Sequence, residues 1–281
     1  MRVTIFGATG LLGKELMRLW KDDEVTGLGS KDADLRDAQR IATVVEQTKP
    51  EWIVLSAAYT DVDGCEINEQ LACNINFRGA MHVADAAKNS GARLVFLSTD
   101  YVFDGSHDRP YEITDTRAPR SVYGRWKAEA EVKLAERLPD CTIIRTSWLF
   151  GAGGKCFPDT ILKLAATRPA IDVVNDQRGS PTYAPDLAEA IIQLCRKGIP
   201  GIVHATNRGE CTWFEFAKEI LEKSGSPTVV RPTTSDKFVR AAERPKYSVL
   251  SPASLERNGI IMPSWQDALS RYLQERRQKQ Q

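Results

Sequence analysis

The chain has 281 residues, which is enough for one large domain or two unequal domains that bury a substantial apolar core. Its 38 basic and 37 acidic residues nearly cancel, so the composition shows no electrostatic footprint for nucleic acid or for an anionic membrane surface. We therefore expect small molecules as its partners.

The cysteines and the first residues bear on where the protein works. Six cysteines are scattered without a Cys-x-x-Cys pair, and most lie in apolar segments, so we interpret them as reduced and structural. The chain enters an apolar β run without a basic-then-apolar leader, and no apolar run approaches the roughly 20 residues needed to span a bilayer. We expect a cytoplasmic protein.

A glycine-rich turn follows the first predicted strand, residues 3–6, and precedes a predicted helix over residues 11–20. Gly7 permits a tight turn, Gly10 lets the backbone approach a pyrophosphate, and Gly13 lets the helix pack on the strand. The phosphates of a dinucleotide would then lie at the helix N-terminus. The alternative is an ordinary turn between a strand and a helix.

The end of the second predicted strand, residues 24–28, bears on the choice of cofactor. Gly29, Ser30 and Lys31 follow it, whereas an NAD-selective site usually carries an acidic residue there to hold the ribose diol. Ser30 and Lys31 can receive a 2′-phosphate. This favours NADPH, with NADH as the alternative.

The remaining pattern predicts an α/β fold, a Rossmann-type doubly wound parallel sheet with a smaller, discontinuous substrate-binding lobe. Strands alternate with helices over residues 1–150, which we expect to form an NAD(P)-binding domain. The pattern loosens afterwards, so residues 151–281 are expected to build mainly the second lobe, while about 171–205 complete the first domain. Ligands of such sheets bind at the C-terminal ends of the strands.

A hydroxyl, a phenol and an ammonium group are predicted to meet at this edge. Thr99 ends an apolar β run, and Tyr123 precedes Lys127 by four residues, so both side chains share one face of a helix. An adjacent ammonium favours the ionised phenol, so we expect Lys127 to lower the pKa of Tyr123 and to make it a proton donor and acceptor near neutral pH. On many solvated helices the same spacing occurs by chance.

With these residues assembled, the chain resembles the extended short-chain dehydrogenase/reductases, and within them the dTDP-4-dehydrorhamnose reductases, along nearly its whole length. The resemblance is carried by Gly7-Ala-Thr-Gly-Leu-Leu-Gly13, Ala57-Ala-Tyr-Thr-Asp-Val-Asp63, Ser98-Thr-Asp-Tyr-Val-Phe-Asp-Gly105, Tyr123-Gly-Arg-Trp-Lys127, Arg145-Thr-Ser-Trp148, Asp176-Gln-Arg-Gly-Ser-Pro-Thr182 and Arg244-Pro-Lys-Tyr-Ser-Val-Leu250. Two departures are Trp126, where the family usually has serine, and residues 29–32, which match no fixed pattern.

The resemblance implies roles for individual residues. Thr99, Tyr123 and Lys127 would form the catalytic group. The cofactor would be bound by these three sets of residues: Gly7, Thr9, Gly10, Leu11, Leu12 and Gly13; Asp34, Leu35, Ala57, Ala58 and Tyr59; and Tyr123 with Lys127. The substrate would be bound by Thr60, Val62, Thr99, Tyr101 and Trp148, with Arg244 for the nucleotide.

The implied activity is the NADPH-dependent reduction of the C4 keto group of dTDP-4-dehydro-L-rhamnose to dTDP-L-rhamnose, a step of deoxysugar biosynthesis. Two alternatives stay open: an epimerase, which the same three catalytic residues would serve, and a non-catalytic regulatory subunit like that of methionine adenosyltransferase. A dehydratase is disfavoured because Tyr101 stands where it needs an acidic residue.

A metal and the oligomeric state are left open by the same resemblance. Family members sometimes bind Mg²⁺ through glutamates at a dimer contact, and Glu15 and Glu189 occupy suitable helices. Both are more often plain helix residues, so we assign no metal ligands. We expect a monomer or a homodimer.

Overall fold

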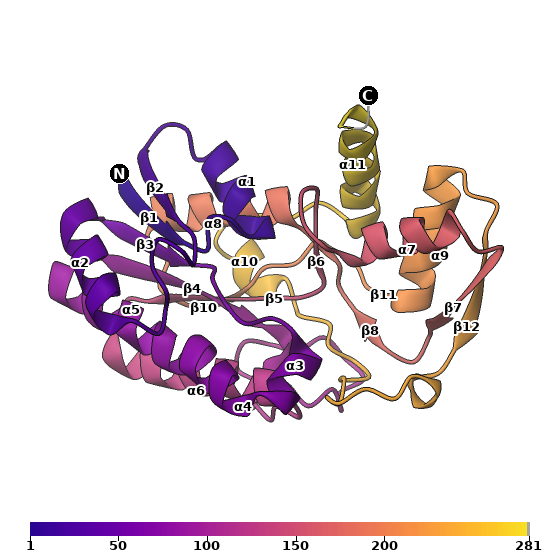
Figure 1. Ribbon diagram of the computed structural model, residues 1–281, viewed down its shortest axis with the longest axis horizontal. Coiled ribbons are helices and arrows are strands. Elements are labelled where there is room, and N and C mark those ends of the chain that lie inside the picture. The colour runs from indigo at the N-terminus through magenta and orange to yellow at the C-terminus, as the bar shows by residue number, and fades with distance from the viewer. Residues whose placement is uncertain (280–281) are drawn as a thin grey trace.

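The computed structural model describes residues 1–279 and contains a large lobe built on a six-stranded sheet and a smaller lobe beside it (Figure 1). Neighbouring strands of the large sheet are all parallel, in the order β10-β5-β4-β3-β1-β2. These strands are β1 (Arg2–Phe6), β2 (Glu24–Leu28), β3 (Trp52–Leu55), β4 (Arg93–Thr99), β5 (Thr142–Thr146) and β10 (Gly201–His204). The predicted doubly wound α/β fold is confirmed.

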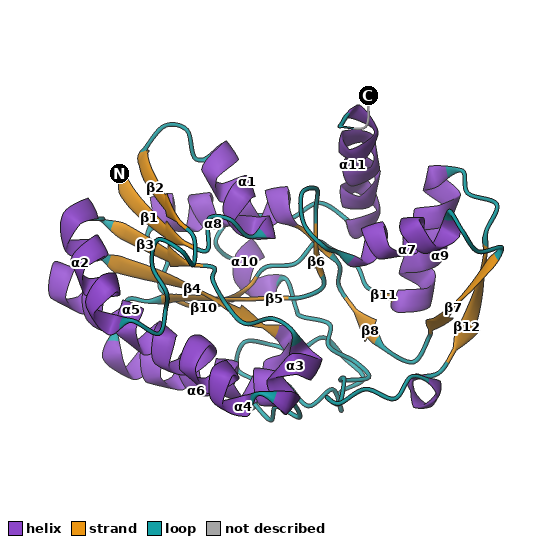
Figure 2. Cartoon of the chain, viewed as in Figure 1, coloured by secondary structure: helices purple, strands orange, loops and turns teal. Residues whose placement is uncertain are grey.

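Helices cover both faces of this sheet (Figure 2). Successive side chains of a strand point to opposite faces, so Val3 and Ile5 pack in one apolar core while Phe6 packs in another. The first core is closed by α1 (Leu11–Leu19) and α8 (Ala184–Lys197), and the second by α2 (Ala38–Thr48), α5 (Gly79–Ser90) and α6 (Val122–Arg137). The C-terminal strand ends are thereby left free for ligands.

Local signals fix the ends of two helices of the large lobe, α5 and α6. Gly91 ends α5 in the left-handed region, with φ 74°, as a glycine after a helix typically does. Ser121 begins α6, because its side chain accepts a hydrogen bond from the N–H of Gly124. Tyr123 therefore lies in the first turn of α6, next to the end of β4.

The smaller lobe has its own apolar core and three two-stranded sheets. Its core is formed mainly by α7 (Phe157–Ala165), α9 (Trp213–Ser224) and α11 (Trp265–Gln278) with β7 (Ala170–Val174) and β12 (Val229–Thr233). The other two sheets pair β6 (Leu149–Phe150) with β9 (Thr182–Tyr183) and β8 (Arg178–Gly179) with β11 (Cys211–Thr212). Thr212 and Glu215 form a capping box at the start of α9.

One expected boundary needs correction. We expected about 171–205 to complete the first domain, and α8 and β10 do join the large sheet. However, β7 belongs to the smaller lobe, because its parallel partner is β12, about sixty residues further along the chain, and not a strand of the large sheet. The large lobe therefore resumes only at α8.

The remaining short elements are α3 (Val62–Ile67), α4 (Glu69–Ala72), the π-helix η1 (Cys73–Arg78), the 3₁₀ helices η2 (Asp100–Val102) and η3 (Ser235–Lys237), and α10 (Ala253–Glu256). All six cysteines are buried free thiols. Within residues 1–279, every helix is too short or too polar to cross a membrane.

Candidate active site

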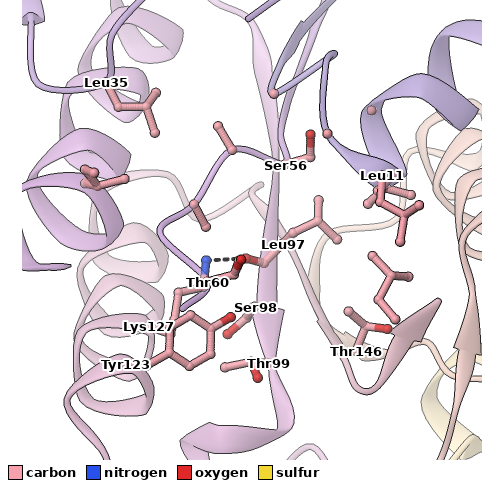
Figure 3. A pocket seen from close by; sticks show the side chains of 18 of the residues that line it. Leu11, Leu35, Ser56, Thr60, Leu97, Ser98, Thr99, Tyr123, Lys127 and Thr146 are labelled. Carbon is pink, nitrogen blue, oxygen red and sulfur yellow. Dashed lines mark hydrogen bonds between the residues drawn. The ribbon is translucent and has the colours of Figure 1, made fainter. Parts of the chain in front are cut away.

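A cavity of about 640 Å³ lies at the C-terminal ends of the sheet strands. Figure 3 shows Tyr123 projecting from α6 towards Ser98 and Thr99 at the end of β4, and Lys127 projecting from the same helix towards Leu97. Of the predicted site residues, those that line the cavity are Gly7, Thr9, Gly10, Leu11, Leu12, Gly13, Asp34, Leu35, Ala57, Ala58, Thr60, Val62, Thr99, Tyr101, Tyr123, Lys127 and Trp148. Segments far apart in sequence are thus brought to one place.

The glycine turn after β1 has no room for side chains at two of its positions. A Cβ on Gly7, which has φ +95°, would fall 2.5 Å from the backbone nitrogen of Ala57. On Gly13 a Cβ would fall 2.0 Å from the carbonyl oxygen of Gly7. Gly10 caps α1 without a side-chain hydrogen bond, so the first N–H groups of the helix are left for an anion. The turn fits the diphosphate of a dinucleotide.

At the end of β2 the structure contains a carboxylate that sequence reasoning did not count. Asp32 folds back, and its Oδ2 accepts a hydrogen bond of 2.8 Å from the N–H of Gly29. Ser30 and Asp34 line the cavity, whereas Lys31 is exposed and lies outside its lining. Asp34 is held by Arg36 through two carboxylate oxygens. Ser30 is therefore better placed than Lys31 to meet the adenosine ribose.

The three predicted catalytic side chains are buried and lie together. Exposed fractions are 5% for Thr99, 9% for Tyr123 and 2% for Lys127. Thr99 Oγ1 donates to Asp100 Oδ1 at 3.0 Å, and Tyr123 is within hydrogen-bonding reach of Thr99. Lys127 Nζ donates to the carbonyl oxygen of Leu97 and lies 4.0 Å from the centre of the Phe96 ring. A hydroxyl, a phenol and an ammonium thus meet at the cavity.

Burial controls the ionisation of this group. We expected Lys127 to lower the pKa of Tyr123, and this was wrong: burial raises the pKa of the phenol above its ordinary value, and the interaction with Thr99 offsets only part of the rise. Burial also lowers the pKa of Lys127 to about 7, against the attraction of Glu131. The low-dielectric surroundings disfavour both phenolate and ammonium. Tyr123 therefore keeps its proton at neutral pH, as a proton donor must.

Trp148 also lines the cavity, and its backbone is unusual. Its φ of +47° lies in the left-handed region, which a bulky residue rarely adopts. The indole stacks on that of Trp213, with ring centres 3.5 Å apart and planes 7° apart. A Cβ on Gly179 would fall 2.6 Å from Trp148 Cε2, so glycine makes room for the ring. Strain of this kind is retained where the surroundings hold it, often at functional sites.

Two predicted residues lie outside the cavity. Tyr59 is half-buried, and its backbone N–H and C=O are both bound by the Asn76 side chain. Arg244 lines a second cavity, of about 590 Å³, where both of its terminal nitrogens bind the Asp63 carboxylate at 2.6 and 2.8 Å. This pairing lowers the pKa of Asp63 to about 2.

Four cations of the segments after residue 150, Lys155, Arg178, Arg240 and Arg244, are separated in space. Arg240 lines the second cavity with Arg244, whereas Lys155 lines the first. Arg178 lies outside both linings and pairs with Glu210 and Glu215. Only two of the four therefore share a site.

Several lining residues were missed by sequence reasoning: Ala33, Ser56, Ile75, Leu97, Ser98, Asp100, Thr146, Ser147 and Leu149. Most follow directly on a predicted strand, so the rule that ligands bind at strand ends could have found them. The buried Oγ1 of Thr146 has no hydrogen-bond partner within the described part of the chain. No sequence motif points to Trp213, because its role depends on its contact with Trp148 in the folded chain.

Possible metal ligands are few. No group of three or more His, Cys, Asp or Glu side chains suited to a metal occurs in residues 1–279. Glu15 is buried and accepts a hydrogen bond from Arg18 at 2.7 Å.

The doubly wound sheet, the glycine turn and the Thr-Tyr-Lys group define the class of this protein, an extended short-chain dehydrogenase/reductase scaffold. The family described as RmlD substrate binding domain matches residues 1–278, and the chain belongs to this family. The resemblance inferred from the motifs is confirmed.

Individual relatives agree with this assignment. The spore coat polysaccharide biosynthesis protein SpsK of Bacillus subtilis is 43% identical, with 98% of each chain covered. A dTDP-4-dehydrorhamnose reductase of Mycobacterium tuberculosis is 39% identical over 96% of this chain and 91% of its own. The crystal structure of dTDP-4-dehydrorhamnose reductase from Bacillus anthracis in complex with NADP is 39% identical, with a TM-score of 0.95 and coverage of 98% and 99%.

Proposed function

We propose that this protein reduces the C4 keto group of dTDP-4-dehydro-L-rhamnose to dTDP-L-rhamnose with NADPH, as a step of deoxysugar biosynthesis. The observation that carries the proposal is the convergence of Thr99, Tyr123 and Lys127 on a cavity that also contains a dinucleotide-type glycine turn. Relatives named for this reaction at about 40% identity over nearly the full length support it.

The residues of the cavity fit a nicotinamide cofactor. The glycine turn with Thr9 would hold the diphosphate, and Asp34 with Leu35 would hold the adenosine. Ala57 and Ala58 leave space for flat parts of the ligand after β3, and Lys127 would bind the nicotinamide ribose. NADPH supplies hydride when bound. The NADP complex of the Bacillus anthracis relative supports NADPH over NADH.

The reaction needs a proton at the carbonyl oxygen as C4 accepts hydride. Tyr123 is protonated at neutral pH and donates that proton, while the hydroxyl of Thr99 orients the carbonyl. The phenolate left behind is costly in a buried site, so the Lys127 ammonium, one turn further along α6, stabilises it. A proton regained from solvent completes the cycle.

The sugar nucleotide would extend from the first cavity to the second. Thr60, Val62, Tyr101 and Trp148 would contact the 6-deoxy sugar, for which an indole offers an apolar face. Arg244 would contact the nucleoside diphosphate at the second cavity. A cytoplasmic location and a monomeric or homodimeric state are further parts of this proposal.

Two alternatives use the same scaffold. An epimerase would use the same catalytic residues, but it would return its cofactor to the starting oxidation state in each turnover. A regulatory subunit would bind the nucleotide without turnover. The intact, buried catalytic group supports the reductase over the regulatory subunit.

The test is NADPH consumption by the full chain with a panel of nucleotide-linked 4-keto sugars. We expect stoichiometric oxidation of NADPH with a dTDP-4-keto-6-deoxy sugar and slower turnover with UDP- or GDP-linked analogues. NADPH binding without consumption for any member of the panel would support the regulatory alternative. Net interconversion of sugars with constant NADPH would support the epimerase.

A further inference from the structure

A buried carboxylate lies directly behind the catalytic group. Glu131 is fully buried, and its oxygens accept hydrogen bonds from Ser98 Oγ at 2.5 Å and from Arg145 Nη2 at 2.6 Å. Arg145 Nε adds a bond of 3.0 Å, and Arg117 Nη1 lies 3.4 Å away. A buried carboxylate is costly unless it is paired and hydrogen-bonded, and here both oxygens have donors.

Its partners come from the elements that carry the reacting groups. Ser98, on β4, immediately precedes Thr99, and Arg145, on β5, leads into the segment that ends at Trp148. Glu131 itself follows Lys127 by one turn of α6, so it shares the face of the helix from which Lys127 projects. One carboxylate thus joins the strand of Thr99, the strand that leads to Trp148 and the helix of Tyr123 and Lys127.

We propose that Glu131 is a positioning residue for the reduction, which fixes β4 against α6 through Ser98 and maintains Lys127 as an ammonium. The proposal rests on the proposed function but assigns a residue that does not line the cavity. Its first effect is geometric, because the hydrogen bond to Ser98 sets the distance between Thr99 and the phenol of Tyr123.

The second effect is electrostatic. Arg145 and Arg117 face Glu131 from β5 and from the loop before α6, and His204 of β10 contacts Arg145 Nη1 at 3.3 Å. His204 is uncharged near neutral pH, because burial lowers its pKa to about 3. Glu131 is therefore the carboxylate on which Arg145 and Arg117 converge, one helical turn from Lys127.

Of these charges, Glu131 is the one that supports the Lys127 ammonium. It raises the pKa of Lys127, against burial, which lowers that pKa to about 7. Asp100, next to Thr99, faces Tyr123 from η2 and is itself buried, with its pKa raised to about 6. Removal of the Glu131 charge would take away the attraction that opposes burial, so the Lys127 ammonium would be lost at lower pH.

The test compares pH profiles of kcat in three chains: wild type, Glu131→Gln and Arg117→Gln. Glu131→Gln keeps the size of the side chain and an acceptor for Ser98 but removes the negative charge, so the alkaline limb should move to lower pH by about one unit. Arg117→Gln changes the local charge in the opposite direction, at a side chain that is one-third exposed. Its replacement removes a cation from Glu131, and the alkaline limb should move to higher pH by a smaller amount.

A role in folding alone would lower activity at every pH without moving the limb, so coincident limbs in the three chains would overturn the proposal. If Glu131→Gln does not fold, Arg117→Gln alone still tests the role of Glu131. An alkaline limb that stays in place or moves to lower pH in that variant would contradict the proposal. Ser98→Ala should reduce kcat without moving the alkaline limb, because this substitution removes no charge.

A second readout separates this proposal from the proposed reaction. The pH dependence of NADPH binding, followed by cofactor fluorescence without any sugar, should shift in the same directions, because Lys127 would bind the ribose. Failure of all three chains to turn over the sugar would count against the reaction. An unshifted pH dependence of binding would count against Glu131.

Discussion

Tyr123 retains its proton because it is buried. Its replacement by Phe removes the proton donor while leaving the ring that packs in the site. We predict a loss of kcat of about 100- to 10,000-fold, the usual range for one general acid, with NADPH binding nearly unchanged. Turnover within a few-fold of wild type would contradict the assignment of the proton donor.

The end of β2 supports a prediction on cofactor choice. Ser30 lines the cavity and Lys31 does not, so Ser30→Asp should place a carboxylate near the adenosine ribose and weaken NADPH more than NADH. Kinetic constants for both cofactors measure this preference. Lys31→Ala is the matched neighbour and should change the preference less. A larger effect at Lys31 would show that the 2′-phosphate lies outside the cavity.

Individual residues of the candidate site could be predicted where chemistry and spacing coincide. Tyr123, Lys127 and the glycine turn were recognisable because each motif has a fixed offset and a fixed place on a strand or helix. The acidity of Tyr123 was predicted wrongly, because burial is a tertiary property that spacing does not contain. Asp32 was overlooked for a similar reason, since its bond to Gly29 depends on the path of a loop.

At the scale of elements, α9 supports the substrate wall through its first residue. Trp213→Ala removes the stack on Trp148, and an aromatic pair is worth about 1 kcal/mol, so we expect the KM for the sugar nucleotide to rise roughly fivefold. The KM for NADPH should not change. The far-ultraviolet exciton signal of the stacked indoles should disappear in the same variant. An equal rise in both KM values would indicate a general loosening of the lobe.

Strands and helices of the large lobe were predictable because most strands are short apolar runs, and because α5 and α8 end at a glycine, Gly91 and Gly198. The smaller lobe was harder. Its β7 has the same apolar character as a strand of the large sheet, and only its pairing with β12 determines its membership. Such long-range pairing leaves no local pattern.

At the scale of the whole molecule, the Asp63–Arg244 pair joins α3 of the large lobe to the segment after β12. We predict that Arg244→Ala raises the KM for the sugar nucleotide more than the KM for NADPH, because Arg244 lies at the second cavity. Steady-state kinetics with each ligand varied in turn test this. The reverse pattern, with dTDP bound normally in calorimetry, would place the nucleotide elsewhere.

The same pair predicts a pH dependence of stability. The pKa of Asp63 is lowered to about 2, so its contribution is present above the ordinary carboxyl pKa and is lost as the pH falls from about 4 towards 2. Thermal unfolding of wild type and Asp63→Asn should therefore differ at pH 6 and converge towards pH 2. A constant difference over this range would exclude the ion pair as its cause.

The central claim is that one chain transfers hydride from NADPH to C4 of a dTDP-linked sugar. The most direct measurement uses NADPH that carries deuterium at both hydrogen positions of the nicotinamide C4, with a dTDP-4-keto-6-deoxy sugar as substrate and NMR of the product. We predict one deuterium at C4 of the sugar in wild type and none above background in Tyr123→Phe over the same time. A product without deuterium at C4, or no reduced sugar from the wild-type chain, would contradict the account.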